Sequence, residues 1–245
     1  MNSQNIELSR RLARAAGEKS QEIRKFEWKD KKEEIIRIPG DSTIAAAVCG
    51  AAAILHNSDV TVEGVIWEQG RRGFFDALKR MKMNIEWEPN NDGYSFDSAN
   101  VRIKWSKGEG IHVSSDQALT MSSELLVLGA VSAFASGKTV ISDNRESPGF
   151  ERDSFKVFAK GLEMLGSHVG DFSEGIVLHG EQELQGNFID SGGKADIALA
   201  LTVTALNSSD TTTISDFGEN DYPVGEFLQI VKDITSELLM TNDKL

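Results

Sequence analysis

Three segments of the chain repeat one pattern, and this repeat constrains the fold more than any other feature. Each segment ends an alanine-rich apolar helix, turns through Asn, Ser, Gly or Asp, and enters a strand rich in β-branched residues: 53–65, 133–144 and 205–217. Such turn residues tolerate left-handed backbone geometry, and Val, Ile and Thr favour strands. A second helix follows each segment, at 71–83, 153–166 and 222–234. The repeat period of roughly 70–80 residues predicts three similar α/β units.

The two helices of each unit differ in polarity. The first helices are expected over 45–55, 124–135 and 196–206, and they show little polar face. Helices that are apolar nearly all round are buried. The second helices place apolar residues at helical spacing but also carry charges, among them Lys79, Arg80, Lys156, Lys160 and Glu163. We therefore expect three buried helices with three partly exposed helices outside them.

Strand pairs complete the first two units, and the third unit needs one from elsewhere in the chain. The expected pairs are 83–88 with 101–105, and 167–172 with 175–180. The third unit ends after its second helix. We expect 23–28 and 33–38, joined by the polar turn 29–32, to form a hairpin that completes it. The prediction is one closed α/β domain over residues 1–245, with 88–100 as a surface loop.

Composition and charge exclude several classes of function. The net charge of −12 over 245 residues argues against a general nucleic-acid binder, which needs excess Lys and Arg. A local basic pocket for a small anion stays compatible with this charge. The lone cysteine, Cys49, forms no intrachain disulfide, and the four histidines lack metal-ligand spacing, so we expect neither metal nor cofactor. GKT at 137–139 lacks the upstream glycine of a phosphate-binding loop.

Membrane and secretion signals are not expected either. The most apolar run, 125–135, is too short to span a bilayer. The N-terminal residues lack the apolar stretch of a signal peptide. We therefore expect a soluble, cytoplasmic protein without a membrane partner.

Four motifs, in this order and at this spacing, resemble the enolpyruvyl transferase family, most closely the EPSP synthases (3-phosphoshikimate 1-carboxyvinyltransferases). They are IPGDSTIAA at 38–46, WEQGRRGFFDALKRM at 67–81, ELLVLGAVSAFASGKTVI at 124–141 and NRESPGFERDSF at 144–155. The resemblance covers residues 23–237 and one of the two domains of the family. It implies three β-α-β-α-β-β units and an active site between this domain and a second one. A homodimer or a companion domain is therefore an expected partner.

The resemblance also implies site residues. Glu124 falls on the glutamate of the family's catalytic Asp-Glu pair, with Ser123 in place of the aspartate, and Glu151 falls on an acid of the RVKESDR loop. Both are candidate catalytic residues. The candidate ligand-binding cations come from the matching motifs: Arg71 (or Arg72), Arg145, Arg152 and Lys194. The implied ligand is a phosphorylated small molecule or phosphoenolpyruvate.

Several positions depart from the family pattern. Counted back from the end of the helix at 153–166, the RVKESDR loop falls on 148–154, where Pro148, Phe150 and Ser154 replace Arg, Lys and Arg. A gapped alternative places Arg145, Glu146 and Ser147 on the KES core. The family's Asp-His-Arg falls on 194–196, and its late Lys before Ser-Phe-Pro falls on Asn220, followed by Asp-Tyr-Pro at 221–223.

These losses bear on chemistry. Enolpyruvyl transfer neutralises phosphate and carboxylate groups with Arg and Lys, and it moves protons through positioned acids and bases. Proline, phenylalanine and serine neutralise no anion.

Each candidate also has a purely structural interpretation. Glu124 is either an acid–base group or an acid that complements a helix N-terminus capped by Ser122 or Ser123. Arg145 and Arg152 either bind an anion or form surface ion pairs with neighbouring acids. Arg71 and Arg72 either face a cleft or are solvated, and Asp41 with Ser42 is expected to cap the first buried helix. Two functions remain open: a transferase that needs a second domain, and a non-catalytic binding or scaffolding module.

Overall fold

Three sheets and the helices between them make up the computed structural model, which describes residues 20–23, 34–38, 41–90, 97–142, 152–172, 175–217 and 222–242. The first unit contains β2 (Glu34–Arg37), α2 (Ser42–Ile54), β3 (Asp59–Ile66), α3 (Gly73–Arg80), β4 (Asn84–Asn90) and β5 (Ser98–Lys104). The second contains β6 (His112–Val113), α4 (Ser115–Ala118), α5 (Glu124–Ser132), β7 (Lys138–Ser142), α6 (Arg152–Met164), β8 (Val169–Phe172) and β9 (Gly175–His179). The third contains β10 (Phe188–Asp190), α7 (Ala195–Ala205), β11 (Thr212–Ser215), α8 (Val224–Asn242) and, from the other end of the chain, β1 (Ser20–Ile23).

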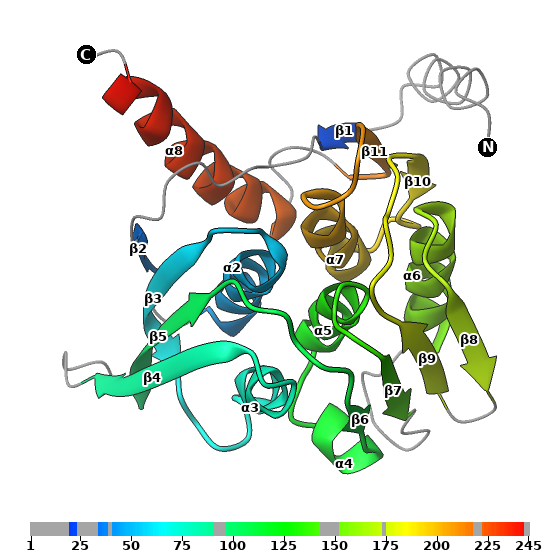
Figure 1. Ribbon diagram of the computed structural model, residues 1–245, viewed down its shortest axis with the longest axis horizontal. Helices are drawn as coiled ribbons and strands as arrows, with labels where there is room; N and C mark the ends of the chain where they lie inside the picture. Colours follow the sequence, from blue (N-terminus) through cyan, green and yellow to red (C-terminus); the bar gives the residue numbers. More distant parts are fainter. Residues whose placement is uncertain are drawn as a thin grey trace.

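The strand order repeats from unit to unit, which confirms the predicted α/β class and its three-unit plan. The first two sheets have the orders β2-β3-β5-β4 and β6-β7-β9-β8, and the third has β10-β11-β1. In each sheet the first two strands are parallel, because a helix carries the chain back between them, and the next strand is antiparallel. Figure 1 shows the sheets around the outside of the molecule.

The three helices α2, α5 and α7 pack against one another in the middle of the molecule (Figure 1). Every residue of α5 is buried, and so are nearly all those of α2 and α7. This arrangement confirms the prediction that the apolar helices lie inside. The helices α3, α6 and α8 lie outside them and expose their charged sides. Burial raises the pKa of the Cys49 thiol to about 12, so this core cysteine stays protonated and unreactive.

The turns that the sequence placed after the first helices have the expected backbone geometry. Asn57, Gly137 and Asp210 lie at equivalent points of the three units, and all three have positive φ angles (66°, 81° and 63°). Asn, Asp and Gly are the residues that adopt this left-handed conformation at low cost. The repeat therefore extends to single backbone positions.

The N-terminal segments differ in part from the prediction. β1 pairs antiparallel with β11, from Ser20 opposite Ser215 to Ile23 opposite Thr212, so an N-terminal strand does complete the third sheet, but it ends at Ile23, where the predicted arm 23–28 was expected to begin. The predicted second arm at 33–38 was assigned to the wrong sheet: β2 pairs parallel with β3 in the first unit. The reason is its proximity to α2, because a strand that runs straight into a helix returns most readily as a parallel β-α-β crossover. Residues 24–33 lie outside the described ranges.

The expected surface loop at 88–100 is shorter than predicted. β4 runs to Asn90, β5 starts at Ser98, and these two residues pair across the ladder. Ser98 and Ala99, at the start of β5, are buried. Within the described residues, no helix is long and apolar enough to cross a membrane.

Candidate functional site

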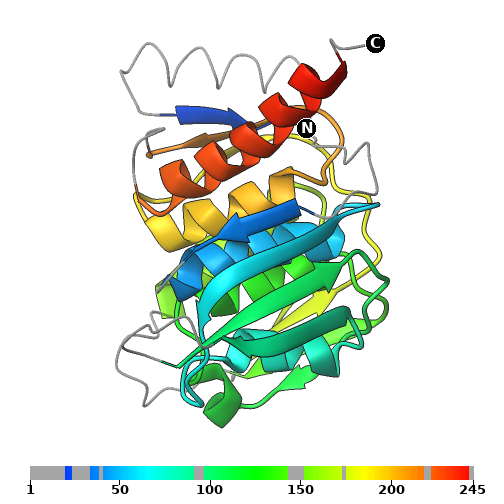
Figure 2. The same cartoon turned by 90° about the vertical axis from the view of Figure 1, so that its left-hand side faces the viewer.

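Strand direction fixes where the helices begin. β2 and β3 are parallel, as are β6 and β7, and β10 and β11. The carboxyl ends of parallel strands share one edge of a sheet, so the two helices that follow them in each unit begin at the same end. In Figure 2 this end lies on the left, where β2 points and where α8 begins.

Three side-chain hydrogen bonds join these helix starts from unit to unit. Thr43 Oγ1 at the start of α2 donates to Glu124 Oε1 at the start of α5, at 3.4 Å. The Lys194 ammonium, just before α7, donates to Ser154 Oγ in the first turn of α6, at 3.0 Å. Tyr222, just before α8, donates its hydroxyl to Asp41 Oδ2 at 2.5 Å. The starts of α2, α5 and α8 are thus joined in one group and those of α6 and α7 in another. Together, at the same end of the molecule, they are here called the helix-start face.

The backbone makes this face receptive to anions. Each helix carries partial positive charge at its N-terminus, together with N–H groups that have no partner within the helix. Anionic ligands are commonly bound where such groups converge. At the start of α2 one of these N–H groups is already used, because Asp41 Oδ1 accepts from Ile44 N at 2.9 Å. This bond confirms that Asp41 caps the first buried helix.

Glu124 lies in the first turn of α5, on the helix-start face, and is 6 % exposed. Its carboxylate accepts from Thr43 and from the backbone N–H of Ser122, at 2.8 Å. Within the described residues it forms no ion pair. Ser123, one of the two serines expected at the helix start, occupies the N-cap position of α5, but its side chain makes no capping bond. The Glu124 carboxylate instead reaches back to the backbone N–H of Ser122, just before the helix.

Tyr222 was not among the candidates from the sequence. It is 62 % exposed and lies over Asp41, in the Asp-Tyr-Pro that replaces the family's Ser-Phe-Pro. Partial burial of the hydroxyl, its bond to Asp41 and the nearby charges of Glu226 and Glu124 raise the pKa of Tyr222 to about 12. The phenol is therefore a neutral donor at physiological pH. One feature of the sequence could have indicated this residue: Tyr222 stands where the family's Ser-Phe-Pro has a phenylalanine, which lacks a hydroxyl.

Lys194 and Ser154 bring two of the compared motifs together. Ser154 is buried, while Lys194 is half-buried at the N-cap position of α7 and makes no capping bond of its own. Arg152 begins α6, two residues before Ser154, so the structure places positions 152 and 194 at the same edge of the face. The Arg152 side chain is outside the described part. Arg145 and Glu151 lie outside the described residues altogether, and so do Pro148, Phe150 and Asn220.

Arg71 and Arg72 precede α3 at the same end of the first unit. Arg72 Nε pairs with Asp76 Oδ2 at 3.2 Å, four residues along the helix. Arg71 is exposed, and among the described residues its guanidinium has no ion-pair partner. The structure thus makes Arg71 the available cation of the pair.

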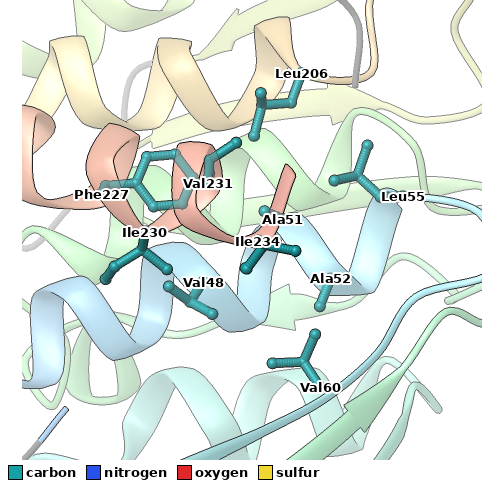
Figure 3. Close-up of a pocket in the computed structure, with 10 residues that line it drawn as sticks. All are labelled: Val48, Ala51, Ala52, Leu55, Val60, Leu206, Phe227, Ile230, Val231 and Ile234. Atoms are coloured by element: carbon teal, nitrogen blue, oxygen red, sulfur yellow. The ribbon is translucent and has the colours of Figure 1, made fainter. Parts of the chain in front are cut away.

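The cavity in Figure 3 is not part of this face. It is an apolar gap of about 20 Å³ between α2 and α8, lined by residues such as Val48, Ala52 and Phe227. A space of this size and lining holds no polar ligand. In the part of the chain that the structure describes, no cluster of three or more His, Cys, Asp or Glu residues could hold a metal ion.

Comparisons with known proteins agree with this architecture. The family model for EPSP synthase (3-phosphoshikimate 1-carboxyvinyltransferase) matches residues 16–228. A 3-phosphoshikimate 1-carboxyvinyltransferase of Bacillus cereus is 30% identical over 181 residues, which cover 74% of this chain and 42% of that enzyme. The corresponding enzyme of a Sulfurihydrogenibium species is 28% identical over the same length. The chain therefore spans less than half the length of these relatives.

Solved structures give the same result. EPSP synthase from Acinetobacter baumannii superposes with a TM-score of 0.67 at 28% identity, over 74% of this chain and 42% of the other. The enolpyruvyl transferase NikO from Streptomyces tendae, at 17% identity and a TM-score of 0.54, shares the fold. With a family model matched over most of its length and the same three-unit architecture, the chain belongs to the EPSP synthase family.

Proposed function

We propose that the chain is a single domain, residues 1–245, that supplies one half of a carboxyvinyl-transfer site and does not turn over alone. The relatives' names give the reaction, transfer of a carboxyvinyl group to 3-phosphoshikimate, for which phosphoenolpyruvate is the donor. The observation that carries the proposal is the helix-start face, on which Glu124, Lys194 and Arg71 lie at the starts of different helices. The matched residues cover 42% of a full-length relative, which is consistent with a site that a second half completes.

The residues take distinct roles in this proposal. Lys194 and Arg71, with Arg145 and Arg152, bind the phosphate and carboxylate groups of the ligands through charge-assisted hydrogen bonds. Glu124 is the group placed to accept or return a proton, since it is buried with a carboxylate oxygen held by one hydroxyl. Glu151 is the second candidate for proton transfer. The opposing half comes from a companion polypeptide or from a second copy of the chain.

A second function is favoured by a separate observation. Ser123 and Ser154 stand where the family pattern has Asp and Arg. The carboxylates of Asp41, Glu124 and Glu226 all help to raise the pKa of Tyr222, so they lie near one another at this face. This excess of acids opposes the binding of a doubly charged phosphate. The alternative is a non-catalytic module that binds a partner through the helix-start face.

The test combines calorimetry with phosphate-release measurements. The isolated chain is titrated with phosphoenolpyruvate and with shikimate 3-phosphate, and turnover is followed with and without candidate companion proteins. We expect weak binding by the isolated chain and phosphate release only with a companion. Lys194→Ala should weaken binding about tenfold, whereas Lys138→Ala, on an exposed lysine at the opposite end of β7, should leave it unchanged.

The outcomes separate the two functions. Phosphate release by the chain alone would overturn the need for a second half. No binding of either ligand at millimolar concentration, and no phosphate release with any companion protein, would overturn the proposed transferase function. The non-catalytic binding module would then be the remaining function.

A further inference from the structure

Two of the four histidines lie opposite each other on neighbouring strands of the second sheet. Val169 of β8 pairs with Leu178 of β9, so the next pair along the two antiparallel strands is His168 with His179. The backbone agrees with this register, because His179 N donates to His168 O at 3.1 Å. Directly opposite residues of antiparallel strands have Cβ atoms about 4.5–5.5 Å apart. Two imidazoles at this separation are close enough to bind one ion together.

Both imidazoles lie on the outer face of the sheet. Leu178 is fully buried and Val169 packs against the core, and successive residues of a strand point to opposite faces. His168 is accordingly exposed and His179 half-buried. His179 pairs with Lys138, the first residue of β7, whereas the helix-start face lies at the carboxyl end of that strand. The histidine pair is therefore at the far end of the sheet from the proposed transfer site.

One of the two rings is held by a neighbouring side chain. His168 Nδ1 lies 2.8 Å from Gln182 Oε1. The Gln182 amide is itself oriented, because its Nε2 donates to the Gly180 carbonyl at 2.7 Å. Since an amide oxygen only accepts, the neutral His168 ring carries its proton on Nδ1, and its Nε2 keeps a lone pair. Metal-binding histidines almost always make such a bond through their second ring nitrogen.

The groups around the pair decide which ions fit. The described residues contain no group of three or more His, Cys, Asp or Glu ligands, so the oxygen-rich cage that Ca²⁺ requires is missing from them. Glu181, beside Gln182, is paired with Lys107. Lys138, on the other side of His179, is exposed and opposes any cation. Imidazole nitrogens favour Cu²⁺, Ni²⁺ and Zn²⁺, which they bind at about 2.0–2.1 Å in the case of Zn²⁺.

From these observations we propose that His168 and His179 bind one divalent transition-metal ion, of the Cu²⁺, Ni²⁺ and Zn²⁺ class, on the outer face of the second sheet. His168 provides Nε2, His179 provides one ring nitrogen, and water fills the remaining positions. Gln182 acts as a positioning residue through His168. The ion ties the start of β8 to the end of β9 and so stabilises the folded chain. This site is independent of carboxyvinyl transfer.

The spacing of the histidines along the chain gave no indication of this pair. His168 and His179 are too far apart for two ligands on one helix, where metal-binding histidines are separated by three or four positions. Only the antiparallel pairing of β8 with β9 brings them together. The expectation from the sequence of no metal site considered spacing alone.

The experiment titrates the full chain with Cu²⁺, and with Mg²⁺ as the comparison ion, by calorimetry and electron paramagnetic resonance. We expect one Cu²⁺ per chain with two nitrogen ligands in the spectrum, and no saturable binding of Mg²⁺. His168→Ala and His179→Ala should each weaken Cu²⁺ binding at least about tenfold. The matched control is His112→Ala, because His112 is an exposed histidine on β6 of the same sheet, and this change should leave binding unaltered.

Two further variants test the surroundings of the pair. Gln182→Ala should weaken Cu²⁺ binding about tenfold, because the His168 ring is no longer oriented. Lys138→Ala should strengthen it, because a repelling charge is removed. Added Zn²⁺ should raise the Tm of the native chain and of His112→Ala, but not that of the His168→Ala or His179→Ala variants. Circular dichroism should be the same for all variants without metal.

Each other outcome overturns the proposal. Unchanged Cu²⁺ binding in the His168→Ala or the His179→Ala variant would show adventitious binding elsewhere on the chain. Equal weakening by His112→Ala would show ions spread over surface histidines, and saturable Mg²⁺ binding would assign the ion to carboxylates. One ion per two chains, with a dimer in sedimentation, would place the ion between two copies. No saturable Cu²⁺ binding up to millimolar concentration would exclude the site.

Discussion

The contact between α2 and α5 depends on the absence of a side chain at Gly50. A Cβ at this position would lie 2.8 Å from Val127 Cγ1 and 3.4 Å from Val131 Cγ2, both fully buried on α5. The nearest contact is too short for two carbon atoms, and a short branched valine surrounded by core has little room to move. Gly50→Ala therefore pushes the two central helices apart.

Two opposing effects set the magnitude. Alanine in a helix interior gains about 1 kcal/mol over glycine. Overpacking a filled core costs about 1–3 kcal/mol. The net loss in the free energy of unfolding is then about 0–2 kcal/mol, and each kcal/mol corresponds to a fall in Tm of about 2–4 °C in a chain of this length.

The second half of this prediction is a double-mutant cycle. Val127→Ala removes the obstructing methyl and by itself should cost about 1.6 kcal/mol for two buried groups. In combination with Gly50→Ala the new methyl occupies the space that Val127 leaves. We expect the double variant to be more stable than the sum of the single effects by about 1 kcal/mol.

Urea unfolding followed by circular dichroism measures all three variants. Gly70→Ala is the matched control, because a Cβ there meets no atom within 4 Å. A cycle that is strictly additive would refute the close packing of α2 on α5.

Three further predictions concern single side chains. In an absorbance titration of the two tyrosines, Tyr222→Phe should remove the tyrosinate transition that has a pKa of about 12 and should leave the transition of Tyr94 in place. If the variant instead loses a transition near pH 10, the bond from Tyr222 to Asp41 is contradicted. Because the folded pKa is raised, this hydroxyl contributes stability that is complete below about pH 10 and is lost as the pH rises toward 12. Asp59 accepts from Arg102 at 2.9 Å, and this bond, with a lesser one from Lys104, lowers the Asp59 pKa. The ionised Asp59 carboxylate therefore contributes stability that is present above about pH 4 and is lost as the pH falls through the lowered pKa. Asp59→Asn should make the free energy of unfolding less dependent on pH in the acid range. An unchanged pH dependence would argue against the pairing. Phe158→Ala empties a fully buried site and should cost about 3–5 kcal/mol in urea unfolding, with Phe158→Leu costing much less.

The interior of the fold was predictable because its signals are local. About a dozen consecutive residues are enough to specify each of its elements. These elements are the alanine-rich helices, the left-handed turns and the amphipathic outer helices. A threefold repeat then favours their arrangement, since three apolar helices bury one another in the middle of the molecule with sheets and outer helices around them. The assignment of β2 failed for the opposite reason: whether a short strand joins the first or the third sheet depends on pairing with a segment far along the chain.

The candidate site was less predictable, because its contacts join distant residues. Tyr222 and Asp41 are separated by 181 positions, and Thr43 and Glu124 by 81. A hydrogen bond between residues so far apart leaves no periodic pattern in the sequence from which it could be predicted. Motif comparison found Glu124 and Lys194 but passed over Tyr222, Thr43 and Ser154, whose roles depend on how the helix starts meet.

The charges on the helix-start face then say what an opposing half must provide. The described cations there include Arg71, Arg72 and Lys194, and Arg72 is already paired with Asp76. The acids Asp41, Glu124 and Glu226 lie near the same surface and act together on Tyr222. Two substrates that carry phosphate and carboxylate groups bring more negative charge than these described cations can neutralise, which leaves Arg145, Arg152 and the opposing half to supply the rest. The proposed transfer reaction therefore requires a companion that presents Arg and Lys toward the helix starts, and a companion with an acidic face would be evidence for the non-catalytic module instead.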